Sequence, residues 1–151
     1  ELMLRSPPLN PDLVELRDRV ENYRLVRRLE TVHGNVLLAL DEQQRACAIK
    51  VIDKSKVVTP GELESLYREY HFLSEAIRHP NVARCLEMLH SSSRLYLVFE
   101  FAGHANLAQV LWSRPGQRLP EPQALSCFQQ VNSGLAHCHS LDIAHRRVTL
   151  A

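Results

Sequence analysis

The chain has 151 residues, of which 45% are hydrophobic and 23% charged, and its formal net charge is +1. This composition is typical of a globular domain with a modest core and argues against a disordered chain. So small a net charge gives no reason to expect nucleic acid or an anionic membrane as a partner. The sequence also shows no apolar stretch of transmembrane length and no signal peptide, so we expect an intracellular protein, cytoplasmic or nuclear.

Residues 1–22 form the first predicted segment, an N-terminal arm followed by a short helix. Pro7 and Pro8 favour an extended arm. Apolar side chains at helical spacing then predict an amphipathic helix over roughly residues 11–21. The residues that set this spacing are Leu13, Leu16 and Val20.

From Tyr23 the pattern changes to one of strands separated by turns. Three antiparallel strands are the simplest arrangement of residues 23–54. Residues 61–77 then show helical periodicity, and two further strands form a hairpin at 82–89 and 95–101. Helices follow at 106–112 and 121–139. Five strands with one embedded helix, followed by helices only, predict an α+β fold in two unequal parts.

Lys50 interrupts the apolar run of the third strand, between Ile49 and Val51. A lysine in such a strand is rarely buried unless an anion meets it, and a phosphate or a carboxylate would serve. The alternative is an edge-strand lysine whose ammonium reaches water.

The cysteines and histidines do not indicate a metal site. The cysteines lack the paired Cys-x-x-Cys spacing of zinc and redox sites, and we expect reduced, buried thiols. His137 and His139 are i and i+2 neighbours on a helix and point to different faces. The four cysteines are Cys47, Cys85, Cys127 and Cys138.

The order of these elements, with the residues at their junctions, resembles a eukaryotic-type protein kinase domain. The similarity is to the calcium/calmodulin- and AMP-activated-kinase-like serine/threonine branch. It covers about residues 23–151 and is carried by four motifs in order: Ala48-Ile49-Lys50, His79-Pro80-Asn81-Val82, the run from Leu95 to Phe101, and the run from Gly134 to Arg146.

The resemblance implies a protein-kinase-like division of the chain. Residues 23–102 would be the small lobe, a five-stranded antiparallel sheet with one helix. Residues 103–151 would be the hinge exit and an incomplete large lobe that ends in the catalytic loop.

The resemblance also implies an ATP site. Lys50 would face the α- and β-phosphates, oriented by a carboxylate of the following helix. Glu69 is the candidate, although its distance from His79 is one residue longer than the family's usual spacing, and Glu62 and Glu64 remain alternatives. A purely structural Lys50–Glu69 ion pair is a further alternative. The other implied nucleotide-binding residues are Val36 and Ala48 around adenine, Phe99 as gatekeeper, Glu100 and Ala102 in the hinge, and Gly34 in the phosphate loop.

Two departures from the family pattern indicate impaired chemistry. Only Gly34 remains of the glycine-rich phosphate loop, and Glu30 adds a negative charge there, so we expect at most weak ATP binding. In the catalytic loop His145 and Arg146 are followed by Arg147, where the family has the aspartate that accepts the substrate proton. A guanidinium cannot act as that base.

The rest of the catalytic loop supports the same expectation. Thr149 replaces the loop lysine, and the sequence ends at Ala151, before the family's magnesium-binding asparagine. We therefore expect no intact catalytic residue and no Mg²⁺. His145 is expected to be a core residue, as it is in the family.

These observations predict a pseudokinase-like binding or regulatory module. The apolar stripe on the 121–139 helix could not all be covered by the small lobe, and an uncovered patch of this kind marks either a surface that binds a protein partner or an aggregation liability. The alternative is an incomplete chain of a divergent ATP-dependent serine/threonine kinase. The stripe consists of Leu125, Phe128, Val131, Leu135 and Cys138.

Overall fold

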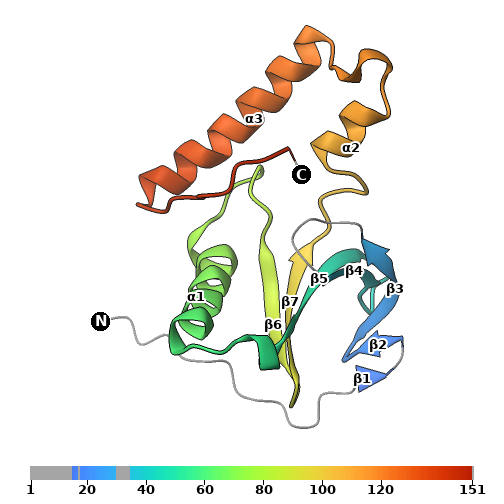
Figure 1. The fold of residues 1–151 in the computed structure, drawn as a ribbon, viewed down its shortest axis with the longest axis vertical. Helices are drawn as coiled ribbons and strands as arrows, with labels where there is room; N and C mark the ends of the chain where they lie inside the picture. The colour runs from blue at the N-terminus through green and yellow to red at the C-terminus, as the bar shows by residue number, and fades with distance from the viewer. Residues whose placement is uncertain (1–14, 17, 30–34, 151) are drawn as a thin grey trace. The chain divides into compact units, whose positions relative to one another are not determined.

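The structure is a computed structural model that describes residues 15–16, 18–29 and 35–150. The chain divides into two compact units. The first contains residues 1–76 and 83–101, and the second contains residues 77–82 and 102–151. Figure 1 shows the sheet with helix α1 in the first unit, and helices α2 and α3 in the second.

A seven-stranded antiparallel sheet forms most of the first unit, with the order β1-β2-β3-β4-β5-β7-β6. The five strands predicted from the sequence are confirmed, and β1 and β2 add a short hairpin at one edge. The strands are β1 (Glu15–Leu16), β2 (Arg19–Val20), β3 (Tyr23–Leu29), β4 (Asn35–Leu40), β5 (Ala46–Asp53), β6 (Cys85–His90) and β7 (Arg94–Glu100).

The prediction of a helix over residues 11–21 is wrong for its described part. Val20 pairs with Tyr23 across the turn between β2 and β3 and is only 3% exposed, in the core beneath the sheet. Glu21, in that turn, has a positive φ of 48°. Burial of Val20 against the sheet therefore outweighs the helical spacing of a few apolar residues. Residues 11–14 and 17 lie outside the described residues.

Apolar side chains cover both faces of the sheet. One cluster gathers Val20, Ala39, Cys47, Ile49, Tyr96 and Val98. The other gathers Cys85, Met88, Leu95 and Leu97, and side chains of α1 (Pro60–His71) pack on it, including Leu66, Tyr67 and Tyr70. The face that carries α1 is therefore the one on which a helix side chain can reach β5.

Helix α1 begins with a capping box. The side chain of Thr59 accepts a hydrogen bond from the backbone of Glu62, and the Glu62 carboxylate accepts one from the backbone of Thr59. Pro60 follows the cap, where its missing N–H costs nothing. A 3₁₀ turn (Lys54–Lys56) precedes the helix, and a π-helical turn (Phe72–Ala76) follows it. The predicted helix over 61–77 is thus α-helical only as far as His71.

The second unit contains α2 (Leu107–Trp112), a 3₁₀ turn (Pro115–Gln117) and α3 (Glu121–Ser140). Both predicted helices are confirmed. Gly134 of α3 approaches the 77–82 segment closely, since a Cβ atom there would lie 3.1 Å from the carbonyl oxygen of Asn81. Among the described residues, no helix has both the length and the apolar character needed to cross a membrane.

Candidate functional site

Lys50 of β5 and Glu69 of α1 form the centre of the candidate site. The Nζ atom of Lys50 lies 3.0 Å from Oε1 and 3.4 Å from Oε2 of Glu69. The two side chains are 27% and 39% exposed, respectively. The structure therefore brings together the lysine and the carboxylate that the sequence singled out, at the rim of the core and within reach of a ligand.

The two alternative carboxylates make other contacts. Glu62 accepts hydrogen bonds from the backbones of Val58 and Thr59 at the start of α1. These bonds lower the pKa of the Glu62 carboxyl. Glu64 forms an exposed ion pair with Arg68 at 3.2 Å. Neither carboxylate therefore meets Lys50 in this structure.

The π-helical turn over Phe72–Ala76 accounts for the long spacing between Glu69 and His79. A π turn closes its hydrogen bonds from i to i+5 and so holds one residue more than an α turn. The additional residue between Glu69 and His79 is therefore taken up inside the helix, and Glu69 still faces β5.

Strand register places three further predicted site residues, Val36, Ala48 and Phe99, on the same face of the sheet as Lys50. Val36 of β4 is directly opposite Lys50, and Phe99 of β7 is directly opposite Ala48. Directly opposed residues of antiparallel strands share a face, and so do residues two positions apart on one strand. Val36, Ala48, Lys50 and Phe99 thus form a partly buried, mostly apolar surface with one ammonium group.

Cys85 contributes to this surface, although the sequence indicated only a buried thiol. It pairs with Phe99 and is fully buried. Burial, with the nearby Glu69 carboxylate, raises the pKa of the Cys85 thiol to about 12. The thiol is therefore neutral at physiological pH and acts as an apolar group beside Phe99. The place of Cys85 beside Phe99 follows from the register of β6 against β7, which no pattern in the sequence indicates.

The predicted hinge residues differ in their surroundings. The backbone N–H of Glu100 donates to the carbonyl of Arg84, and the Glu100 carboxylate accepts from the backbone N–H of Arg84. Ala102 is exposed and belongs to the second unit. Gly34 and Glu30 of the predicted phosphate loop lie outside the described residues.

The predicted catalytic loop lies in the second unit. His145 is exposed, so the expectation that it is a core residue is wrong for this structure. Its Nδ1 atom instead accepts a local hydrogen bond from the backbone N–H of Arg147, at 3.3 Å. Arg146, between them, has a positive φ of 60°, which gives the loop a tight turn. Beyond the loop, the carbonyl of Leu150 accepts a hydrogen bond from Ala108 at the start of α2.

His79 and His137 form a contact within the second unit and do not form a metal site. Their rings stack with centroids 5.2 Å apart, and Nε2 of His79 lies 3.1 Å from the Ser133 hydroxyl. Among the residues that the structure describes, no group of three or more His, Cys, Asp or Glu side chains is placed to hold a metal ion.

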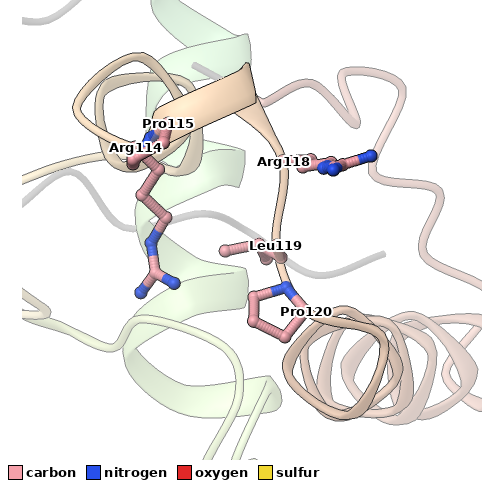
Figure 2. A pocket seen from close by; sticks show the side chains of 5 residues that line it. All are labelled: Arg114, Pro115, Arg118, Leu119 and Pro120. Atoms are coloured by element: carbon pink, nitrogen blue, oxygen red, sulfur yellow. The ribbon is translucent and has the colours of Figure 1, made fainter.

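A hollow of about 300 Å³ lies beside the loop before α3 and contains none of the predicted site residues. Figure 2 shows that Arg114 and Arg118 point in different directions there. Arg114 donates to Gln123 at 2.9 Å. The two guanidinium groups therefore do not form a joint anion site. The lining residues are Arg114, Pro115, Arg118, Leu119 and Pro120.

Residues 31–148 match the protein kinase domain family. The chain is 40% identical over 104 residues to CBL-interacting protein kinase 4 of Oryza sativa subsp. japonica, a match that covers 68% of this chain and 23% of the relative. It is 31% identical over 138 residues to CBL-interacting protein kinase 31 of the same plant, covering 90% of this chain and 30% of the relative.

An animal protein kinase matches a similar part of the chain. The chain is 33% identical over 118 residues to NUAK family SNF1-like kinase 2 of Rattus norvegicus, covering 78% of this chain and 18% of the relative. The chain thus spans less than a third of the length of each of these three relatives.

Proposed function

Because this chain belongs to the protein kinase family, we propose that it binds ATP weakly through its small lobe and does not itself transfer the phosphoryl group. The observation that carries the first half is the Lys50–Glu69 pair on the face shared with Val36, Ala48 and Phe99. In kinases such a lysine contacts the α- and β-phosphates and depends on the carboxylate for its direction.

Weak binding follows from the composition of the phosphate loop. Glycine lets backbone N–H groups approach phosphate oxygens closely, and this sequence keeps only Gly34 of the family's glycines. Glu30 adds a like charge to that of the phosphates. The adenine side of the site has the apolar residues that such a base requires.

The loss of phosphoryl transfer follows from Arg147, which replaces the proton acceptor. Arginine keeps its proton at any physiological pH, so it cannot take one from a substrate hydroxyl. Kinases use ATP as its magnesium complex. The expectation that Mg²⁺ plays no part is therefore not retained, and the test below includes the metal.

We propose further that the chain acts as a regulatory binding module through α3. Phe128 is 66% exposed, and Leu125 and Val131 are exposed beside it on the helix. An apolar patch of this kind favours a protein partner. The proposed compartment is the cytoplasm or nucleus, where ATP is available and where the described free thiols stay reduced.

A second candidate is a portion of a longer ATP-dependent serine/threonine kinase. The length of the relatives favours it, since each extends well beyond the matched region. In that case Arg147 would still impair catalysis, and the exposed face of α3 would pack against further helices.

Transfer of radiolabelled phosphate from Mg²⁺-ATP to a mixed serine/threonine peptide pool separates the two candidates. We expect no transfer above the background of Lys50→Met, either from this chain or from a chain extended along its coding sequence. Transfer by the extended chain that Lys50→Met abolishes would favour the enzyme.

The binding role is tested by capture of partners from cell extract on the immobilised chain. We expect Phe128→Glu to lose a partner that wild type retains. The matched variant Gln130→Glu, exposed on the same helix, should retain it.

A further inference from the structure

Three arginines of β2 and β3 lie on one face of the sheet. Arg19 is directly opposite Arg24 in the antiparallel pairing of these strands. A β-bulge between Leu25 and Arg27 then shifts the register by one residue. Because of this shift Arg24 and Arg27, three positions apart, point to the same side, whereas a regular strand would direct them to opposite sides.

This arginine strip, composed of Arg19, Arg24 and Arg27, shares the face of the candidate nucleotide site. Arg27 is directly opposite Leu38, which in turn is opposite Ala48. Arg27 thus lies two strands away from Ala48, at a distance of about 10 Å from the strand spacing. All three arginines are exposed.

Arg19 and Arg24 lie directly opposite each other, and no carboxylate of the described residues neutralises either of them. Like charges directly opposite one another destabilise an antiparallel pair. Among the described residues, neither Arg19 nor Arg24 has a carboxylate within ion-pair distance, and the side chain of Arg24 reaches only Gln44, at 3.4 Å.

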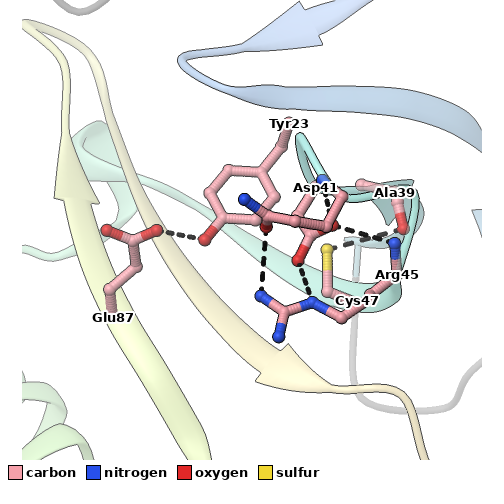
Figure 3. A network of polar contacts seen from close by, with 7 residues as sticks. Tyr23, Ala39, Asp41, Arg45, Cys47 and Glu87 are labelled. Carbon is pink, nitrogen blue, oxygen red and sulfur yellow. Dashed lines mark hydrogen bonds and ion pairs between the residues drawn. The ribbon is translucent and has the colours of Figure 1, made fainter.

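Two acidic side chains of this unit, Asp41 and Glu87, have other partners. Figure 3 shows Asp41 held by Arg45, at 2.7 Å, and Glu87 accepting a hydrogen bond from Tyr23. Burial and the Glu87 carboxylate raise the pKa of the Tyr23 hydroxyl, so it stays protonated and keeps donating. These carboxylates are therefore not available to the arginine strip.

We propose that the arginine strip is a docking surface for an acidic, extended peptide segment of a partner protein. Guanidinium groups bind carboxylates through two parallel hydrogen bonds, which suits a planar acidic side chain. Alternate residues of an extended peptide project to one side about 7 Å apart, a spacing similar to that between successive same-face positions of a strand. Arg24 and Arg27 are successive same-face positions of β3, so glutamates at alternate positions can meet these two arginines, while Arg19 flanks Arg24 on the neighbouring strand.

The size and charge of the strip favour a peptide over a nucleic acid or a membrane. Tight nucleic-acid binding neutralises many phosphates, on the order of six to ten. The strip offers three cations, and the chain as a whole carries a net charge of only +1. A short acidic peptide matches this small, local charge.

Arg28 provides a matched control on the same strand. It is directly opposite Leu37, which is opposite Ile49, so it lies on the other face of the sheet. It is exposed like the arginines of the strip. Arg28→Gln changes the net charge of the protein by the same amount as Arg24→Gln does, but it leaves the arginine strip intact.

The test is fluorescence anisotropy with the 1–151 chain and a labelled peptide of about eight residues, with glutamate at alternate positions. We expect saturable binding that weakens with salt. Arg24→Gln should weaken it about tenfold, the usual effect of losing one charged hydrogen-bonding pair. Arg19→Gln should also weaken it, and Arg28→Gln should leave it within about twofold.

Several outcomes would overturn the proposal. They are an equal loss in Arg28→Gln, binding of a lysine-substituted peptide with the same affinity, or stronger binding of single-stranded DNA or anionic vesicles than of the peptide. Thermal unfolding of each variant separates folding from binding. Because Arg19→Gln removes a repulsion, we expect it to unfold no earlier than wild type.

Discussion

The ammonium of Lys50 and the carboxylate of Glu69, 3.0 Å apart, link strand β5 to helix α1. Water reaches both side chains, which are 27% and 39% exposed, and it screens their attraction. A pair of this kind contributes no more than about 1 kcal/mol to stability. We therefore expect its main effect to be on the direction of the Lys50 side chain.

A double-mutant cycle tests this division between stability and direction. We expect Lys50→Met and Glu69→Gln to show a coupling free energy below about 1 kcal/mol in urea unfolding. A coupling of several kcal/mol would instead mean that the pair is a structural ion pair whose chief role is to hold the fold.

Two glycines are expected to respond in opposite ways to alanine. A Cβ atom at Gly134 meets the Asn81 carbonyl at 3.1 Å and Val82 at 3.3 Å, and backbone atoms cannot easily move aside. A Cβ at Gly61 meets nothing within 4 Å, in the first turn of α1. Gly134→Ala should therefore destabilise by about 1 to 3 kcal/mol, whereas Gly61→Ala should stabilise by up to about 1 kcal/mol. Chemical denaturation of both variants measures the two signs, and stabilisation by Gly134→Ala would contradict the close approach.

His90 should make stability depend on pH. It is buried in β6 and stacks on Tyr67 of α1, with ring centroids 6.1 Å apart. Burial, and then the charge of Lys54, lowers its pKa from the ordinary 6.5. Both folded and unfolded states hold a neutral His90 above pH 6.5. Below pH 6.5 His90 takes up its proton more readily in the unfolded state than in the folded state. The stability that depends on a neutral His90 is therefore lost as the pH falls from 6.5 through the folded pKa.

The measurement is urea unfolding between about pH 7 and about pH 5. We expect stability to fall on acidification, with His90 responsible for at most about 1.4 kcal/mol per pH unit. His90→Phe keeps an aromatic ring against Tyr67 and should flatten the slope. An unchanged slope in that variant would assign the pH dependence to other groups.

The core of the sheet and the exposed face of α3 should differ sharply in their tolerance of truncation. Ile49 is 0% exposed in the cluster beneath the sheet. Ile49→Ala should cost about 2 to 5 kcal/mol, because it removes buried methyl groups and leaves a cavity. Val131→Ala, on the exposed face, should stay within about 0.5 kcal/mol. An equal cost at Val131 would mean that this face is covered.

Much of the fold could be predicted because its strands and helices show strong local patterns. Lys50 is recognisable as the one charge inside the apolar run from Ala48 to Ile52. The β1–β2 hairpin was missed because its strands are two residues long and their stabilisation comes from tertiary contacts, such as the burial of Val20. No local periodicity encodes such contacts.

The details of the candidate site depend on the register of the strands, which local sequence patterns do not reveal. The sequence left Glu62, Glu64 and Glu69 open as partners of Lys50. The capping box takes Glu62, and a π turn absorbs the additional residue after Glu69. The place of Cys85 beside Phe99 and the common face of Arg24 and Arg27 likewise follow from strand pairing and a bulge.

We propose that Lys50, directed by Glu69, holds the phosphates of ATP. Titration of the 1–151 chain with a fluorescent ATP analogue, with and without Mg²⁺, tests it most directly. We expect weak, saturable binding that Lys50→Met weakens about tenfold or more, because a charged hydrogen bond to phosphate is lost. The control Lys56→Met, at an exposed lysine of the 3₁₀ turn before α1, should bind as wild type does. Equal binding by the Lys50→Met and Lys56→Met variants would contradict a role for Lys50 in holding the phosphates.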